Sequence, residues 1–342
     1  YPPALYPGLS PCCLRWMRLR RSRPCKRPQT SFCLLLMALL LITSSYAWFT
    51  ANQTVTISTL QVNVKASNGL QISADATNWK TVLDKQDLVT AATTYDTLIN
   101  QLPETDLEPV STTGNVTDGK MDMYYGVAEA DDTGVYKLTA TKQAEATGKT
   151  GKYIAFDLFL KVDNDTTIYM TPNSNVNMAG TSDKGLQNAA RVGFVTEGHA
   201  TVDADPGTIR TLSSNTAADI WEPNYDTHTA SAVAAARDTY GITTSTTNGT
   251  QLEYYGIKSA ITTANNITMQ QTTAPDATYF SKVTPKWGTT ANNTATPEFK
   301  QLSAGVTKIR IYMWVEGQDV DCENGASGSD IKFDLQFTAT KP

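Results

Sequence analysis

The chain has 342 residues, a formal net charge of −5 and five cysteines. Seven of its 28 Lys and Arg residues precede residue 30, so the remainder carries 21 basic against 33 acidic residues, a net charge of −12. Nucleic acids and anionic lipids are bound mainly through Lys and Arg, so neither is expected as a partner. Because only Cys322 follows residue 33, the remainder cannot form an intramolecular disulfide and needs a hydrophobic core.

The N-terminal part has the pattern of a secretory signal. A basic stretch without acids is followed by apolar Phe32–Ile42 and then by Ser45-Tyr46-Ala47, which fits the small-x-Ala rule for cleavage. We expect residues 17–47 to be a signal peptide cleaved after Ala47, and residues 1–16 to be upstream read-through. The alternative is an uncleaved N-terminal membrane anchor, which needs about 20 apolar residues. Either way the protein is expected to be secreted or held at the cell surface, with membrane contact only through this segment.

Residues 48–342 are expected to form one extracellular domain with many short strands. Val55–Val64 alternates apolar and polar residues, as a strand with one buried face does. Asn68-Gly69 favours a tight turn and Leu70–Ser73 resumes the alternation, so a hairpin is predicted here. Further strands are predicted at Met123–Val127, Val135–Thr139, Tyr153–Val162, Thr167–Thr171, Ala190–Val195 and Tyr254–Ile257.

The clearest strand patterns lie near the C-terminal end. Ile309–Val315 and Ile331–Phe337 both alternate, which predicts strands with one face in the core and the other towards water. Helices are predicted only within Leu83–Leu102 and at Thr229–Tyr240, and a loop-rich insertion is predicted around 196–296. The whole pattern favours an all-β fold, an antiparallel β-sandwich of jelly-roll type with long loops and one or two short helices.

No recognisable catalytic motif is present, so the chain is not expected to be an enzyme. His199 and His228 are the only histidines, they do not form a His-Glu-x-x-His pattern, and both are expected to be exposed in loops. Cys322 has no neighbouring base in the sequence and is expected to be a half-buried free thiol. A hydrolase, with a pair of carboxylates brought together by the fold, ranks behind the binding and structural functions.

The loop Glu316–Gly325, between the two clearest strands, concentrates acidic residues. Asp319, Asp321 and Glu323 alternate along it, and carboxylates are the ligands that Ca²⁺ prefers. The spacing departs from that of an EF-hand loop, so two interpretations stay open. The three residues form a calcium site, or the loop is a solvated acidic turn whose side chains cap their own backbone. No other cofactor is expected.

The segment Trp221–His228 mixes aromatic, acidic and amide side chains. Such a mixture suits a carbohydrate-binding surface. It is also typical of a turn next to a proline that its Trp holds against the core. Both interpretations stay open.

Two stretches resemble known exported proteins. Ala47-Trp48-Phe49-Thr50 with the following Thr59–Val64 resembles the start of mature TasA/camelysin-type proteins of Gram-positive bacteria. The stretch Ile311–Cys322 is similar to the ending of uncharacterised exported proteins of gut bacteria. The first resemblance implies a jelly-roll subunit of the fibres of a biofilm matrix. The metallopeptidase activity described for camelysin is not expected, because matching metal ligands are absent.

These features predict an exported structural protein of the cell surface or extracellular matrix that associates with itself or with other surface proteins. The segment Trp48–Lys65 is predicted to act as an assembly strand, which adds to the sheet of a neighbouring copy. The alternative is that Val55–Val64 completes the sheet of its own domain. The alternative function is a carbohydrate-binding or adhesin-like surface module.

Overall fold

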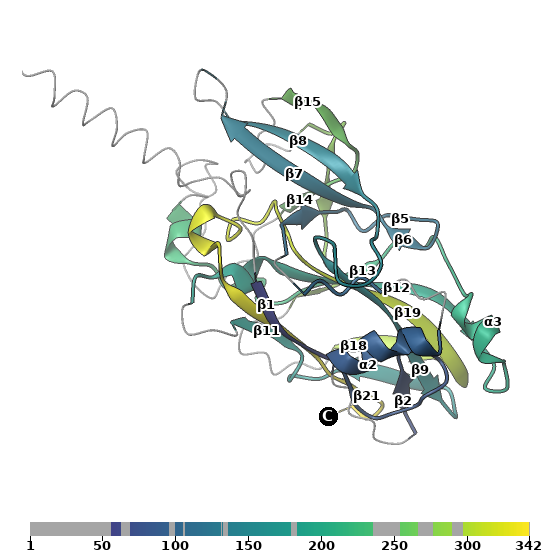
Figure 1. The fold of residues 1–342 in the computed structure, drawn as a ribbon. Coiled ribbons are helices and arrows are strands. Elements are labelled where there is room, and N and C mark those ends of the chain that lie inside the picture. The colour runs from purple at the N-terminus through teal and green to yellow at the C-terminus, as the bar shows by residue number, and fades with distance from the viewer. Residues whose placement is uncertain are drawn as a thin grey trace, which may run out of the picture. The chain divides into compact units, whose positions relative to one another are not determined.

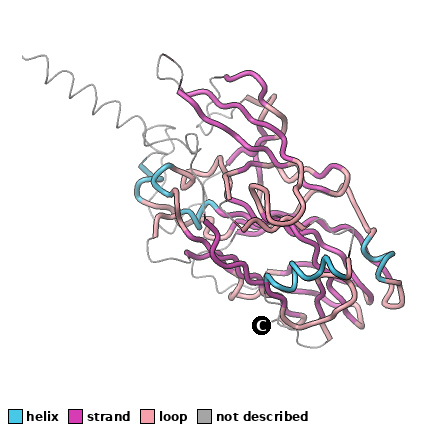
Figure 2. Tube along the Cα trace, in the orientation of Figure 1, coloured by secondary structure: helices cyan, strands magenta, loops and turns pink. Residues whose placement is uncertain are grey.

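The computed structural model describes residues 56–62, 69–95, 100–104, 107–130, 132, 136–178, 183–234, 254–265, 276–288 and 297–341. All of them belong to one compact unit, in which strands predominate over short helices (Figures 1 and 2). The expected signal peptide, its cleavage site after Ala47 and residues 1–16 lie outside the described residues. Within the described ranges, no helix is both long and apolar enough to cross a membrane.

A six-stranded sheet forms the centre of the fold. Its strands, in spatial order, are β17 (Trp287–Gly288), β13 (Asp219–Glu222), β12 (Ala190–Ala200), β19 (Gly305–Val315), β9 (Ile154–Val162) and β2 (Gln71–Ser73). The long strands β12, β19 and β9 are antiparallel neighbours, and every residue of β19 is buried. The strands predicted around Tyr153, Ala190 and Ile309 are therefore confirmed.

One face of this sheet packs against a second layer made of two smaller sheets. Their strands, in spatial order, are β11 (Asn175–Met178), β20 (Asp330–Leu335), β1 (Thr56–Val62) and β3 (Leu83–Asp84), and then β18 (Glu298–Leu302), β10 (Thr166–Met170) and β21 (Phe337–Thr338). Alternate residues of β9, β12 and β19 meet those of β20 in the main hydrophobic core. β20 alternates buried and half-buried residues, which confirms the predicted closing strand. The fold is thus an all-β sandwich.

Part of the opposite face of the six-stranded sheet packs against a third layer, through residues of β4 (Val110–Ser111), β5 (Val116–Thr117), β6 (Lys120–Met121), β7 (Met123–Ala130) and β16 (Phe280–Val283). In this layer β7 and β16 also pack with β8 (Tyr136–Gln143), β14 (Tyr254–Ile257) and β15 (Ile261–Asn265) in a hydrophobic cluster of their own. Met121 and Met123 pack there against Tyr312 and Trp314 of β19. The prediction that this side of β19 faces water is therefore wrong. Tyr312 and Trp314 are 0% exposed and Arg310 is 5% exposed.

The helices are short. They are α2 (Lys85–Thr90), η1 (Ala91–Thr93), η2 (Leu186–Ala189), α3 (Pro206–Arg210), η3 (Asn324–Ala326) and residues 230–234. α2 begins with a capping box between Asp84 and Asp87, and it confirms a helix within Leu83–Leu102, although a shorter one. Within the predicted loop-rich insertion around 196–296, the described residues contain the end of β12, all of β13 and four further strands, one of which is the predicted strand Tyr254–Ile257.

The predicted hairpin around Asn68-Gly69 is wrong. β1 pairs in parallel with β20 and antiparallel with β3, whereas β2 pairs with β9 in the other layer. Alternation of apolar and polar residues predicts a strand but not the strand it pairs with. Because a turn signal lies between the patterns of β1 and β2, the sequence favours pairing of these two neighbours. Gly69, with φ of +89°, instead lies where the chain enters the six-stranded sheet.

Phe194 of β12 joins the two layers of the sandwich. Its ring lies edge-on to Phe299 at 4.9 Å and to Phe337 at 6.3 Å between ring centroids. We expect Phe194→Ala to leave a cavity and to lower the free energy of unfolding by about 3–5 kcal/mol. The control Val202→Ala removes an exposed side chain and is expected to change it by less than about 0.5 kcal/mol. Urea unfolding compares the two, and equal stabilities would show that Phe194 is not part of a packed core.

Candidate functional site

Two segments that the sequence analysis singled out meet at one end of the six-stranded sheet. β12 is antiparallel to both β13 and β19, so its first residues lie beside the last residues of those two strands. Arg191 at the start of β12 is thereby brought to Glu222 at the end of β13 and to Asp319, which follows β19. We call Arg191, Glu222, His228, Glu316, Asp319 and Asp321 the carboxylate cluster.

Arg191 is the cationic centre of the carboxylate cluster. Its Nη2 donates to Glu222 Oε1 at 2.6 Å and to Asp319 Oδ2 at 2.5 Å, and its Nη1 donates to two backbone carbonyls. The arginine is 0% exposed, Glu222 1% and Asp319 4%. Charges so deeply buried persist only when paired, so this contact joins three chain segments.

His228 and Asp321 form a second buried pair in the carboxylate cluster. His228 Nδ1 lies 2.7 Å from Asp321 Oδ2, and Asp321 Oδ1 accepts the N–H of Thr229 at 2.9 Å. Burial alone would lower the pKa of His228, but the hydrogen bond and charge of Asp321 raise it, while burial raises the pKa of Asp321. The expectation of an exposed His228 is wrong, because Asp321 holds its ring inside. His199 is exposed as expected, but it lies in strand β12 and not in a loop.

Glu316 and Cys322 complete the buried polar loop. Glu316 is 0% exposed, and its carboxylate accepts the indole N–H of Trp314 at 3.0 Å and the N–H of Gln318 at 3.1 Å. Burial raises the pKa of Glu316 to about 7. Burial and the neighbouring carboxylates also raise the pKa of the Cys322 thiol well above its usual value, so it is a packed, unreactive thiol. Cys322 is fully buried, not half-buried as expected.

The three residues predicted as calcium ligands separate into two groups. Asp319 and Asp321 lie together with His228, whereas Glu323 turns to Ser231, whose hydroxyl donates to it at 2.5 Å. The alternative of a solvated acidic turn is wrong about the solvent, because Asp319 and Asp321 are 4% and 1% exposed. Its prediction that side chains cap their own backbone is confirmed, because Asp319 Oδ1 accepts the N–H of Asp321 at 2.8 Å. Whether calcium binds remains a prediction.

The segment Trp221–His228 is a turn held to the core, not an exposed binding surface. Trp221 is 0% exposed and belongs to the main hydrophobic core. Asn224, with φ of +56°, donates from its side-chain amide to the carbonyl of Val176 at 2.8 Å. Sequence reasoning missed Arg191, whose only signal was a lone cation in the apolar stretch Ala190–Val195.

Removing the cation of the carboxylate cluster tests its role. We expect Arg191→Met to lower the free energy of unfolding by about 3–5 kcal/mol, because it removes the ion pairs that buried Glu222 and Asp319 make with Arg191. Adding Glu222→Gln and Asp319→Asn to that variant should restore most of the loss. Denaturant unfolding at neutral pH measures both. Full stability of the single variant would show that the ion pairs do not hold these segments together.

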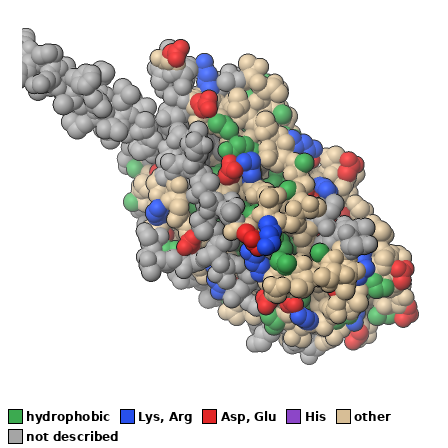
Figure 3. Space-filling model, viewed as in Figure 1, with side chains coloured by type: hydrophobic (Ala, Val, Ile, Leu, Met, Phe, Trp, Pro, Cys, Tyr) green, Lys and Arg blue, Asp and Glu red, His purple; other side chains and the backbone are tan. Residues whose placement is uncertain are grey.

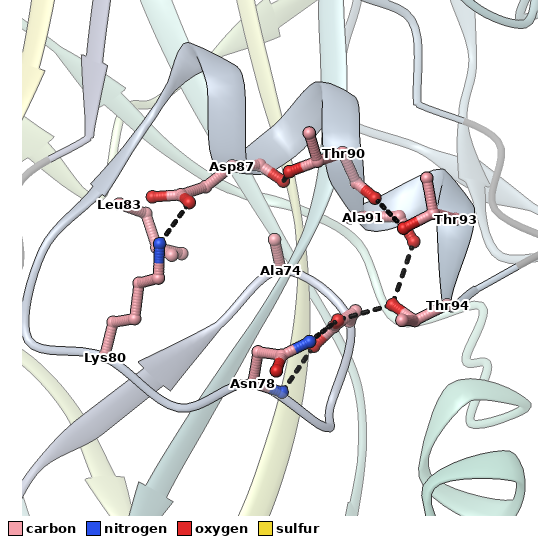
Figure 4. Close-up of a pocket in the computed structure, with 10 residues that line it drawn as sticks. Ala74, Asn78, Lys80, Leu83, Asp87, Thr90, Ala91, Thr93 and Thr94 are labelled. Atoms are coloured by element: carbon pink, nitrogen blue, oxygen red, sulfur yellow. Dashed lines mark hydrogen bonds and ion pairs between the residues drawn. The ribbon is translucent and has the colours of Figure 1, made fainter.

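A separate polar pocket of about 260 Å³ lies beside α2. The turn that bears Asn78 faces the helical residues Asp87, Thr90 and Thr93 across it, and Lys80 pairs with Asp87 at one end (Figure 4). Burial would raise the pKa of Asp75 at its floor, but hydrogen bonds from Thr94, Asn78 and Thr77 hold it well below its usual value. We call this the Asp75 pocket. Its walls offer hydroxyl, amide and charged groups to a polar ligand.

Buried charges also line the third-layer face of the central sheet. Asp157 of β9 pairs with Arg310 at 2.6 Å and with Lys308 at 3.4 Å. Beside them Glu197 of β12 accepts the N–H of Ser214 at 2.9 Å through Oε2, while its buried Oε1 has no hydrogen-bond partner in the described part of the chain. Burial raises the pKa of Glu197 from 4.5 to about 6.

Glu197 makes stability depend on pH. Because its pKa is higher in the folded state, its contribution is fully present below pH 4.5 and is lost as pH rises through 6. Glu197→Gln removes this loss, so between pH 4.5 and 7 we expect the variant to gain up to about 2 kcal/mol over the wild type. The exposed residue Glu129 supplies the control Glu129→Gln, which should follow the wild type. Parallel pH profiles for all three proteins in denaturant unfolding would contradict this account.

No family model, curated protein sequence or solved structure matches the chain.

Proposed function

We propose that this is an exported structural protein of the cell surface or extracellular matrix, which assembles by exchanging its strand β1 between copies. The observation that carries the proposal is the position of β1. It lies between β20 and β3, so neither of its neighbours is adjacent to it in the chain. In Figure 1 this strand, at the purple end of the colour scale, lies against a sheet whose other strands come from later in the chain.

The pairing of β1 can be reproduced by a second copy. β1 meets β20 in parallel register, with Thr59 opposite Lys332 and Val62 opposite Leu335. Such pairing needs only an extended segment of the right sequence, since main-chain hydrogen bonds provide affinity and alternate side chains provide specificity. The buried residues Phe333 and Leu335 of β20 lie in the core, so a vacated slot would be filled again by the nearest available β1.

The route of the chain permits exchange. β1 leads to β2, which belongs to the other layer, so moving β1 to a neighbour breaks no hairpin. A strand passed from each copy to the next makes a head-to-tail contact, and a head-to-tail contact that does not close produces a filament. The sequence predicts two roles for this strand: it is donated to a neighbouring copy, or it completes the sheet of its own domain. Both roles use the same position, beside β20.

The surface favours main-chain pairing over apolar association. Among the described residues the large exposed apolar side chains are Val82, Val89 and Val202. On the face shown in Figure 3, acidic and basic side chains are interspersed with hydrophobic ones. A surface of this kind offers little apolar area to a partner, so an exchanged strand is the better-supported route to assembly.

The alternative function, a carbohydrate-binding or adhesin-like module, is supported by the Asp75 pocket. Its amide, hydroxyl and carboxylate groups are those that bind sugar hydroxyls. Oligosaccharide binding that is lost on Asn78→Ala would favour this function.

Disulfide trapping tests the exchange. Two single variants, Thr59→Cys and Lys332→Cys, place one thiol on β1 and one opposite it on β20. Both are made with the four N-terminal cysteines replaced by serine, and Cys322 is buried. When the two proteins are mixed and oxidised, we expect a heterodimer whose linkage, mapped by mass spectrometry, joins residues 59 and 332.

The chain that carries both substitutions is the control. It should link within one chain when dilute and between chains when concentrated. A link that forms only within the chain at every concentration, with no heterodimer from the mixed single variants, would show that β1 stays in its own domain.

A further inference from the structure

We propose that the carboxylate cluster binds one divalent transition-metal ion of the Zn²⁺ class, with His228, Asp319 and Asp321 as ligands. The site would fasten the loop after β19 to the segment after β13. It does not depend on the exchange of β1.

The geometry brings three ligand groups together from two chain segments. One ligand atom of each of the three residues lies within 4.8 Å of the others. His228 follows β13, whereas Asp319 and Asp321 follow β19, so the paired ends of the central sheet set their approach. One imidazole nitrogen with two carboxylate oxygens suits Zn²⁺ and its neighbours, because Ca²⁺ prefers a shell made of oxygen alone.

The two carboxylates have acceptor capacity left. An ionised carboxylate has about four lone-pair sites. Asp319 accepts from Arg191 and from the N–H of Asp321. Asp321 accepts from the N–H of Thr229 and faces the His228 ring. A metal ion bound by His228 Nδ1 would replace the proton that this atom shares with Asp321. It would leave in place the hydrogen bonds that the two carboxylates accept from Arg191 and from the N–H groups of Asp321 and Thr229.

The carboxylate cluster gives a cation favourable surroundings. Four of its carboxyl groups are each at most 4% exposed: Glu222, Glu316, Asp319 and Asp321. Arg191 pairs with Glu222 and with Asp319, and His228 pairs with Asp321. Asp319 and Asp321 lie close enough to repel each other when both are ionised, and a divalent cation between them would offset that repulsion.

His228 presents its Nδ1 to the aspartates, since this atom lies 2.7 Å from Asp321 Oδ2. The side chain is 6% exposed, so a metal ion held by Nδ1 would be shielded from water. Nε2, on the far side of the ring, would not take part in the site.

The test compares the two histidines of the chain. Metal-free full-length protein is dialysed against Zn²⁺ and its metal content measured, for the wild type, His228→Gln and the matched control His199→Gln. His199 is exposed and lies in β12, so its replacement should leave the site intact. We expect the wild type and His199→Gln to bind one more Zn²⁺ per chain than His228→Gln. Zn²⁺ should raise their melting temperatures, whereas Ca²⁺ should not.

Equal Zn²⁺ content in the two variants would overturn the proposal, as would a rise in melting temperature that Ca²⁺ reproduces. Circular dichroism checks that His228→Gln folds. If this variant does not fold, the visible absorption spectrum of the wild-type protein loaded with Co²⁺ decides. Visible bands of nitrogen and oxygen coordination that Zn²⁺ abolishes support the site. A spectrum of the hydrated ion, or of thiolate ligation from the N-terminal cysteines alone, contradicts it.

Discussion

The rest of the structure depends on the burial of β12, β19 and β9 on both faces. On one face alternate residues are uniformly apolar and pack against the second layer, with Phe333 and Leu335 of β20 opposite them. On the other face, positions of the same strands carry Asp157, Lys308 and Arg310, which are buried as well. Their contacts there include Tyr95, Glu145 and the backbone at 210–212. A charge in that position must be paired, so the sheet imposes ion pairs that the sequence alone does not reveal.

The two buried polar regions, around Asp157 and in the carboxylate cluster, pair their charges in different ways. Around Asp157, cations and carboxylates lie on adjacent strands, so the pairs follow directly from the register of β9 and β19. The carboxylate cluster instead gathers its members from three segments and contains more carboxyl groups than cations. The loop that carries Asp319 and Asp321 leads directly into β20, the strand that pairs with β1.

Local patterns predicted strands well and their partners poorly. Alternation located β19 and β20, and the apolar run located β9, because those patterns depend only on which faces are buried. Burial of the second face of β19 was not predictable, since Arg310 and Tyr312 are residues that normally face water and only the third layer shows that they do not. The hairpin at Gly69 failed for the same reason, because pairing is decided by contacts far apart in the sequence.

The candidate site was predicted in part. Asp319 and Asp321 stood out as an acidic pair, but Arg191 and His228 lie far from them in the sequence, and no local pattern joins the three segments. Both Trp221 interpretations fitted the sequence, and only burial distinguishes them.

The central claim is that β1 is held less firmly than the sheet it completes. β19 pairs along most of its length with two long neighbours, whereas β1 has β20 on one side and only two residues of β3 on the other. Hydrogen–deuterium exchange of the native protein, resolved by peptide, measures this directly. The account predicts that amides of β1 exchange faster than those of β12, β19 and β9, and that the amides of other strands stay protected while β1 exchanges. Equal protection of β1 and β19 would show that they open together, and would contradict a separable strand.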